Sequence, residues 1–125
     1  MMKLLVVDDE VDICDFVRNF FKERNFDVKM AHNGRTAVEL FRVESPEIVL
    51  LDLRMPIMGG IEALKEIKAL CNKCKVIIVT AMEDLESVDE AKKCGAVDYI
   101  TKPLLLEQLE RTVLTLAEQI KAETV

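Results

Sequence analysis

Runs of aliphatic residues alternate along this chain with amphipathic stretches, a pattern typical of repeated strand–helix units. The aliphatic runs predict strands near residues 3–8, 26–31, 47–52, 75–80 and 97–101. The amphipathic stretches predict helices near residues 10–23, 34–43, 60–70, 84–94 and 105–121. We therefore expect one α/β domain over residues 1–125, a length close to the commonest domain size.

The composition of the strands indicates their order in the sheet. Residues 4–7, 48–51 and 76–79 are continuously apolar, as expected for parallel strands that helices cover on both faces. Residues 26–30 alternate between apolar and polar, and residues 97–100 include an aspartate, so we expect these two strands at the edges. The resulting order is 2-1-3-4-5, that of a five-stranded parallel sheet in a doubly wound, flavodoxin-like (βα)5 sandwich.

Charge and hydropathy exclude two kinds of partner. The formal net charge is −6, whereas a nucleic-acid surface needs clustered Lys and Arg, so no direct nucleic-acid binding is expected. No apolar run approaches the roughly 20 residues of a membrane span, and no signal-peptide pattern opens the chain. We expect a cytoplasmic protein that acts on genes, if at all, through another domain or partner.

The four cysteines are expected to be reduced thiols. Cys71 and Cys74 have the spacing of half a zinc site or of a redox pair. Cys14 and Cys94 lie in separate helical stretches and supply no matching second pair. A four-ligand metal site is therefore unsupported, and a helix end that tolerates small apolar residues is the simpler interpretation.

Polar residues end or follow four of the predicted strands. Asp8 and Asp9 end the first strand and Asp52 the third, while Thr80 and Lys102 close the fourth and fifth. The carboxyl ends of parallel strands meet at one edge, where open α/β sheets bind ligands. Three carboxylates about 4 Å apart would repel by roughly 4 kcal/mol per pair at a surface-like dielectric. We therefore expect a divalent cation there, and an all-oxygen site fits Mg²⁺.

Each of these residues has a simpler interpretation when it is taken alone. The aspartates at 8 and 9 suit a helix N-terminus, and Asp52 suits the turn that follows it. Thr80 suits the end of a β-branched strand, and Lys102 suits a solvated loop. Their joint position favours phosphoryl chemistry. The acids would bind a metal ion, and the hydroxyl of Thr80 and the ammonium of Lys102 would bind an anion.

The chain resembles the receiver domains of bacterial two-component response regulators over its whole length. The resemblance rests on four segments in the family's order and spacing, which are Val6–Glu10, Leu51–Pro56, Val79–Ala81 and Asp98–Pro103. It implies that Asp52 accepts a phosphoryl group from a phosphohistidine of a sensor histidine kinase. The chain would then be no enzyme in the usual sense, since only its own phosphorylation and dephosphorylation are catalysed.

The resemblance also implies the metal ligands. Asp9, Asp52 and the backbone carbonyl of Arg54 would bind Mg²⁺ directly, and Asp8 would act mainly through a metal-bound water. Lys102 would pair with the phosphoryl oxygens, and the Thr80 hydroxyl would donate a hydrogen bond to them. These roles suit a reaction that depends on positioning and on charge neutralisation.

Further roles concern signalling. The resemblance implies a cis peptide between Lys102 and Pro103, and a switch in which Thr80 moves toward the phosphoryl group and Tyr99 turns inward behind it. The face formed by helix 84–94, strand 97–101 and helix 105–121 would then change. Its charged residues could support a homodimer or bind an output partner, although a solvated surface also explains them; they are Glu86, Glu90, Lys92, Lys93, Asp98, Glu107 and Arg111.

Three alternatives and two departures from the family pattern complete the prediction. A haloacid-dehalogenase-type phosphatase would need a second aspartate where Arg54 stands. An FMN carrier would need a Gly-, Ser- or Thr-rich loop where Asp8-Asp9-Glu10 stands. A degenerate receiver that works without phosphorylation stays open as an interaction module. Gly59 replaces an acid that the family often has, and Arg54 and Met82 occupy positions that tune phosphate lifetime, which predicts slow decay.

Overall fold

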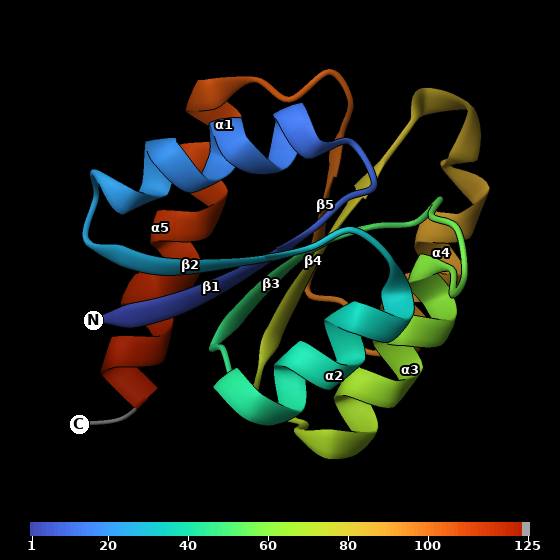
Figure 1. Cartoon of the computed structure of the whole chain (residues 1–125), viewed down its shortest axis with the longest axis horizontal. Helices are drawn as coiled ribbons and strands as arrows, with labels where there is room; N and C mark the ends of the chain where they lie inside the picture. Colours follow the sequence, from blue (N-terminus) through green and yellow to red (C-terminus); the bar gives the residue numbers. More distant parts are fainter. Residues whose placement is uncertain (124–125) are drawn as a thin grey trace.

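The computed structural model describes residues 1–123, so the last two residues of the predicted domain lie outside the described part. Strands and helices alternate along the chain (Figure 1). The strands are β1 (Met2–Val7), β2 (Phe26–Ala31), β3 (Ile48–Asp52), β4 (Lys75–Thr80) and β5 (Asp98–Thr101). The helices are α1 (Val11–Lys22), α2 (Gly34–Glu44), α3 (Gly60–Leu70), α4 (Glu86–Lys93) and α5 (Leu106–Glu123).

The five strands form one parallel sheet in the order β2-β1-β3-β4-β5. This confirms the predicted topology and the prediction that β2 and β5 are its edges. In the register of the sheet, Val7 lies beside both Ala31 and Leu51, and Asp52 lies beside Val79. The strands therefore end almost level with one another, which brings the residues that follow them to a single edge.

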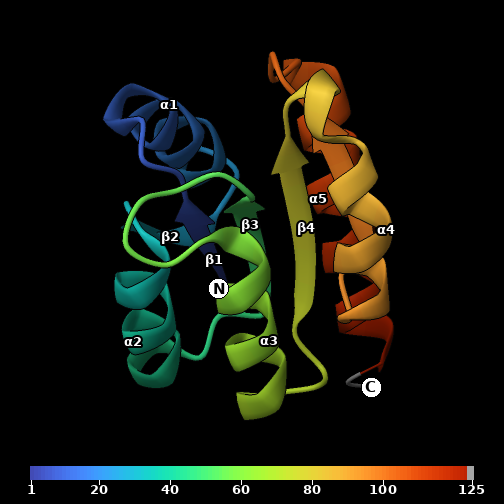
Figure 2. The same cartoon turned by 90° about the vertical axis from the view of Figure 1, so that its right-hand side faces the viewer.

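Two layers of helices cover the sheet. Helices α1 and α5 lie on one face, and α2, α3 and α4 lie on the other (Figures 1 and 2). The central strands contribute side chains to both cores: Leu5 and Leu51 face the α2–α3–α4 side, whereas Leu4 and Leu50 face the α1–α5 side. Each fully buried aliphatic side chain of this kind contributes roughly 1.5–3 kcal/mol. The unbroken aliphatic runs are explained by this two-sided burial.

The observed helix bounds differ from the predicted ones in the second half of the chain. The predicted helix 84–94 is a short 3₁₀ turn, Met82–Asp84, followed by α4. No side-chain cap satisfies the start of α4 at Leu85, and the backbone N–H of Asp84 donates to the Ala81 carbonyl in a tight turn instead (3.0 Å). Helix α5 continues two residues past the predicted end, where the residues are good helix formers.

The apolar content of these helices serves the two cores. Within residues 1–123, no helix is both long enough and apolar enough to cross a membrane. The longest, α5, buries only one stripe, which consists of Leu109, Val113, Leu116 and Ala117. The other sides of this helix are largely exposed and carry charged residues.

Candidate functional site

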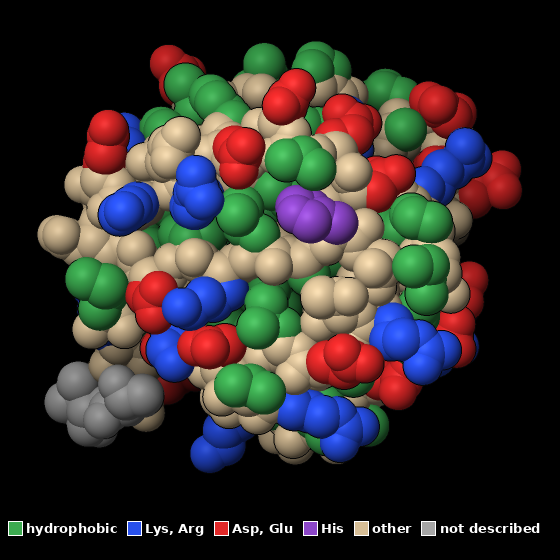
Figure 3. Space-filling model, in the orientation of Figure 1, with side chains coloured by type: hydrophobic (Ala, Val, Ile, Leu, Met, Phe, Trp, Pro, Cys, Tyr) green, Lys and Arg blue, Asp and Glu red, His purple; other side chains and the backbone are tan. Residues whose placement is uncertain are grey.

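The three aspartates singled out by the sequence lie together at the carboxyl edge of the sheet. Asp8 follows β1 directly, and Asp52 is the last residue of β3. One carboxylate oxygen from each of Asp8, Asp9 and Asp52 lies within 4.8 Å of the others. Asp8 and Asp52 are only 3% and 5% exposed, whereas Asp9 faces solvent. Acidic side chains are visible on the surface around the place where β1 leads into α1 (Figure 3).

Lys102 reaches into this group of acids from the end of β5. Its ammonium nitrogen lies 3.0 Å from Asp52 Oδ2, 3.2 Å from Asp8 Oδ2 and 3.8 Å from Glu10 Oε1. Its backbone N–H donates to the Thr80 carbonyl (2.8 Å), and its peptide bond to Pro103 is cis. The backbone that carries the lysine is thus fastened to the end of β4, next to the acids.

The backbone fixes the other oxygen of each buried carboxylate. Asp52 Oδ1 accepts the N–H of Arg54 (3.2 Å), and Asp8 Oδ1 accepts the N–H of Glu10 (2.9 Å). Each carboxylate therefore turns one oxygen to its own following backbone and the other toward Lys102. Glycine at position 60 lets the start of α3 approach closely, because a Cβ there would lie 2.4 Å from the Asp52 carbonyl oxygen.

Burial and charge shift the proton affinities of this site. Burial raises the pKa of the Asp52 carboxyl, and the negative charge of Asp8 adds to this effect, while the hydrogen bond from Lys102 opposes it. Burial alone would lower the pKa of Lys102, but its hydrogen bond to Asp52 and the charges of Asp52 and Asp8 outweigh this and raise the pKa to about 12. Lys102 is therefore a cation at neutral pH, but its single positive charge does not fully compensate the burial of the Asp52 carboxylate and its repulsion by Asp8.

The donor set fits a hard divalent cation. Within residues 1–123, this is the only group of three or more His, Cys, Asp or Glu side chains whose ligand atoms come so close together. All three donors are carboxylate oxygens, which suit Mg²⁺ rather than a softer metal that prefers thiolate ligands. The exposed Asp9 leaves one side of the group open to water, and Mg²⁺ usually keeps several water ligands.

Thr80 and Tyr99 occupy neighbouring strands beside this site. Thr80 is 1% exposed, and its hydroxyl donates to the Ala81 carbonyl (3.3 Å). The Tyr99 ring is half-buried, packs against the core on the α4 side, and has the Lys92 ammonium 5.2 Å from its centre. The tyrosine is therefore neither a fully solvated edge residue nor a fully buried one.

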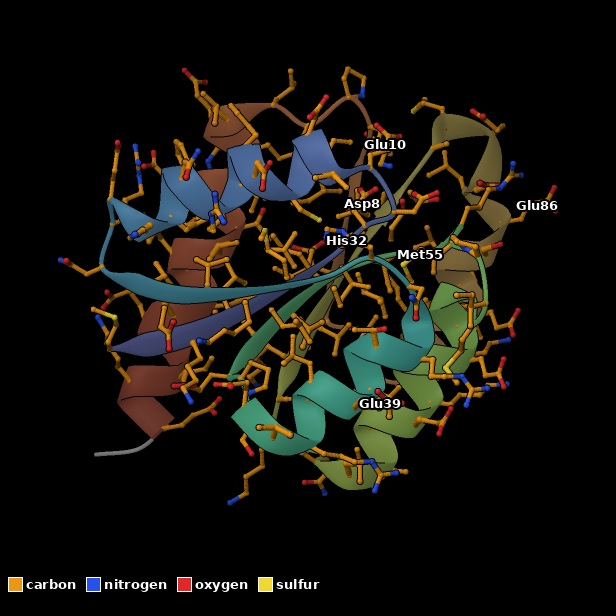
Figure 4. All side chains as sticks on the ribbon, viewed as in Figure 1. Asp8, Glu10, His32, Glu39, Met55 and Glu86 are labelled. Carbon is orange, nitrogen blue, oxygen red and sulfur yellow. The ribbon has the colours of Figure 1, made fainter. Side chains whose placement is uncertain are left out.

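Several partners at this edge were not predicted from the sequence. The Arg54 guanidinium forms an ion pair with Asp84, which bridges the loops after β3 and β4. Glu10 is a third acid near Lys102, and His32 and Cys14 contact the Asp8 backbone. Figure 4 shows Asp8, Glu10 and His32 close together around the end of β1. Spacing in the sequence gives no signal for these contacts, because they depend on how the loops fold.

The predicted cysteine pair lies at the opposite edge of the sheet. Cys71 directly follows α3, Cys74 precedes β4, and the Cys74 thiol donates to the Cys71 carbonyl (3.3 Å). All four cysteines are free thiols. Burial raises the pKa of Cys74 to about 11, so this thiol keeps its proton at neutral pH. These contacts are those of a helix end.

Comparison with known proteins places the chain in a family. The model of the response regulator receiver domain matches residues 4–114. The chain is 41% identical to chemotaxis protein CheY of Listeria monocytogenes over 116 residues, covering 89% of this chain and 98% of CheY. It is 41% identical to regulatory protein AtoC of Escherichia coli over 111 residues, covering 89% of this chain. The chain spans only 24% of the length of AtoC.

Solved structures agree with this assignment. A response regulator receiver domain protein of Clostridium thermocellum superimposes with a TM-score of 0.89 at 28% identity, covering 98% of both chains. NtrX of Brucella abortus superimposes with a TM-score of 0.90 at 28% identity, covering 99% of this chain and 29% of NtrX. With the acids, the threonine and the lysine at their strand ends, the chain belongs to the family of response regulator receiver domains.

Proposed function

We propose that the chain acts as one receiver domain over residues 1–125 and that Asp52 accepts a phosphoryl group from a sensor histidine kinase. The observation that supports this most strongly is the surroundings of Asp52. The carboxylate is buried at a strand end, has two other aspartates within 4.8 Å, and pairs with Lys102 at 3.0 Å. Phosphoryl transfer needs this combination of positioning and charge neutralisation more than it needs covalent help.

The contacts of Asp52 suggest which of its oxygens reacts. Oδ1 accepts the Arg54 N–H, whereas Oδ2 lies 3.0 Å from the ammonium that would pair with the phosphoryl oxygens, so we assign Oδ2 as the nucleophile. In the transfer, a P–O bond forms to Oδ2 and the P–N bond to the donor histidine breaks, so the electron pair returns to the imidazole. The Lys102 ammonium, now on Oδ2, is in reach of the incoming phosphoryl oxygens and would neutralise part of their charge.

A bound Mg²⁺ would supply the remaining positive charge. Asp9, Asp52 and the Arg54 carbonyl would hold the ion directly, and Asp8 would hold it mainly through a water ligand. The two buried carboxylates have only Lys102 as a nearby cation among the described residues, so a second cation relieves their repulsion. The chain's own part is to keep these oxygens converged before the donor arrives.

The same site supports a switch. The Thr80 hydroxyl donates its hydrogen bond to the carbonyl of the neighbouring Ala81. A phosphoryl oxygen is a stronger acceptor and would replace this carbonyl. The movement of Thr80 would open space into which the half-buried Tyr99 ring can turn. We define the α4–β5–α5 face as the exposed surface of these three elements, and we propose that it binds an output partner or a second copy of the chain.

The test is intact-mass measurement after incubation with acetyl phosphate. The wild-type protein should gain one phosphoryl group in the presence of Mg²⁺ and none when the metal is chelated. Asp52→Asn should gain none, because it lacks the nucleophile. As a matched control, Asp89→Asn removes an exposed carboxylate of α4 and should react like the wild type.

The negative result is equally informative. If the wild type gains no mass where a control receiver is modified, phosphorylation at Asp52 is refuted. The domain would then act as an interaction module that works without phosphorylation. Modification that persists in Asp52→Asn would show that another residue is the acceptor.

A further inference from the structure

The backbone carbonyl of Asp8 lies where two strands separate. The β1–β2 ladder continues one residue past Val7, because the Asp8 N–H donates to the Ala31 carbonyl (3.1 Å). Strand β2 then ends and the chain turns into α2. Within residues 1–123, no backbone N–H donates to the Asp8 carbonyl. A carbonyl in this position needs another donor, since unpaired buried backbone groups are rare.

Two side chains supply that donor. His32 Nδ1 lies 3.1 Å from the Asp8 carbonyl oxygen, and Cys14 Sγ lies 3.4 Å from it. The two donors are 3.7 Å apart, and one carbonyl oxygen has lone pairs for both. The Cys14 side chain is fully buried, and its thiol donates to the Asp8 carbonyl. In this arrangement His32 carries its hydrogen on Nδ1.

With this contact, every oxygen of Asp8 has a partner. Oδ1 accepts the Glu10 N–H, Oδ2 pairs with Lys102, and the carbonyl oxygen has His32 and Cys14. The peptide between Asp8 and Asp9 is planar, so the direction of this carbonyl also sets the position of the Asp9 backbone. The Asp9 carboxylate is exposed and makes no hydrogen bond or ion pair within residues 1–123. Its place in the acidic group therefore depends on the backbone.

We infer that His32 and Cys14 are positioning residues for the metal site, which they align by holding the Asp8 carbonyl. The inference rests on the proposed function, because the site that they align is the proposed Mg²⁺ site. Mg²⁺ demands nearly ideal octahedral geometry and tolerates displaced ligands poorly. Loss of a group that orients a metal ligand typically weakens metal binding about 10- to 100-fold.

The test compares His32→Leu, which removes the donor, with His32→Asn, which keeps an N–H near the position of Nδ1. The Mg²⁺ dissociation constant of the unphosphorylated protein is measured by calorimetric titration, and unfolding in urea is measured separately. His32→Leu should bind Mg²⁺ about tenfold more weakly than the wild type, whereas His32→Asn should stay within about threefold. Adding Cys14→Ala to His32→Leu should weaken binding further.

Asn33→Ala is the matched control in the same loop. The Asn33 side chain caps α2 by accepting the Thr36 N–H (2.8 Å), so its loss destabilises the loop without touching Asp8. A purely structural role for His32 predicts that Asn33→Ala and His32→Leu both lose stability and both keep the wild-type dissociation constant. That result overturns the inference while the proposed function stands. If the wild type neither binds Mg²⁺ nor accepts a phosphoryl group, the proposed function fails and the inference fails with it.

Discussion

At the scale of single residues, the site is governed by negative charge that has been removed from water. Asp8 and Asp52 are almost fully buried, and Lys102 is the cation that both of them contact. Two carboxylates sharing one ammonium leave net negative charge in a poorly solvated place, which is unfavourable for the folded state. The same imbalance would favour a bound divalent cation, so an arrangement that costs stability suits the proposed metal site.

The first prediction concerns Asp52→Asn in a chelating buffer. Because the folded protein raises the pKa of Asp52 above its ordinary 3.8, the stability gained by protonation is fully present below that value. It is lost as the pH rises through the folded pKa, so at pH 7 the ionised carboxylate destabilises the fold. The variant should therefore have a higher free energy of unfolding than the wild type, by about 1 kcal/mol, which is a typical size for the effect of one substitution. The measurement is urea unfolding.

The advantage of Asp52→Asn should shrink as the pH falls into the acid range. Added Mg²⁺ should reverse the order of stabilities, since the wild type binds the ion more tightly. A variant that is less stable than the wild type at pH 7 without Mg²⁺ would show that the ion pair with Lys102 outweighs the burial of Asp52.

The second prediction concerns the lifetime of the phosphorylated state. The Arg54 guanidinium forms an ion pair with Asp84, and the apolar Met82, in the same 3₁₀ turn as Asp84, is 62% exposed. We expect both side chains to impede a water that attacks the phosphoryl group. The double variant Arg54→Asn, Met82→Glu should lose the group about tenfold faster, equivalent to about 1.4 kcal/mol of barrier.

The decay is followed by intact mass after the phosphodonor and excess Mg²⁺ have been removed. Lys73→Asn, which changes an exposed charge at the opposite edge of the sheet, serves as the control and should decay like the wild type. An unchanged lifetime in the double variant would sink this explanation of slow decay.

At the scale of elements, the packing of α3 against the end of β3 sets the shape of the site. A Cβ on Gly60 would lie 2.4 Å from the Asp52 carbonyl oxygen and 2.6 Å from the Leu53 Cα, so backbone would have to move. A Cβ on Gly59 would meet nothing closer than 3.9 Å, and its φ of −70° suits any residue.

The third prediction uses this pair of glycines. Gly60→Ala should destabilise the fold by roughly 1–3 kcal/mol, as overpacking usually does. Gly59→Ala should change the free energy of unfolding by less than about 1 kcal/mol. A small increase in stability is expected, because alanine reduces the conformational entropy of the unfolded chain. Both are measured by urea unfolding. Equal stabilities for the two variants would mean that the start of α3 can shift freely away from β3.

The fourth prediction concerns the movement of β5. Tyr99 is the only tyrosine and the chain has no tryptophan, so intrinsic fluorescence reports on this one ring. Phosphorylation should change that fluorescence if the ring turns inward away from Lys92. Thr80→Val keeps the shape of the side chain but cannot donate a hydrogen bond, so it should accept the phosphoryl group with a much smaller change. An equal change in both proteins would disconnect Thr80 from the switch.

The elements also show what the sequence could and could not predict. Unbroken aliphatic runs identified β1, β3 and β4 as central strands, because burial on both faces leaves a direct compositional signal. Once the strands were placed side by side and parallel, their carboxyl ends had to meet at one edge, which predicted that Asp8, Asp9 and Asp52 lie together. The start of α4 was placed too early, since a 3₁₀ turn and an α-helix share their apolar spacing over so few residues. The Arg54–Asp84 bridge and the contacts of His32 join separate loops, and loop paths leave no periodic signal.

At the scale of the whole molecule, the proposed phosphorylation site and the proposed output face occupy adjoining surfaces. The acids lie at the carboxyl edge of the sheet. Thr80 lies beside Thr101 in the register of β4 and β5, and Tyr99 lies beside Ile78, two residues earlier along each strand. The charged side chains of this face are exposed and of both signs; they are Glu86, Glu90, Lys92, Lys93, Asp98, Glu107 and Arg111. A face of mixed charge can be complementary to itself across a two-fold axis.

The last prediction is that phosphorylation promotes self-association through this face. Sedimentation velocity at tens of micromolar protein should show a monomer without phosphodonor and a larger dimer fraction with it. High salt should reduce that fraction, because exposed ion pairs are screened over roughly 10 Å at 0.1 M salt. Arg111→Glu should weaken the dimer, whereas Arg42→Glu, an equal charge change on α2 across the sheet, should not. A phosphorylated protein that stays monomeric would instead assign the face to a different output partner, because the switch would then change a surface that does not recognise itself.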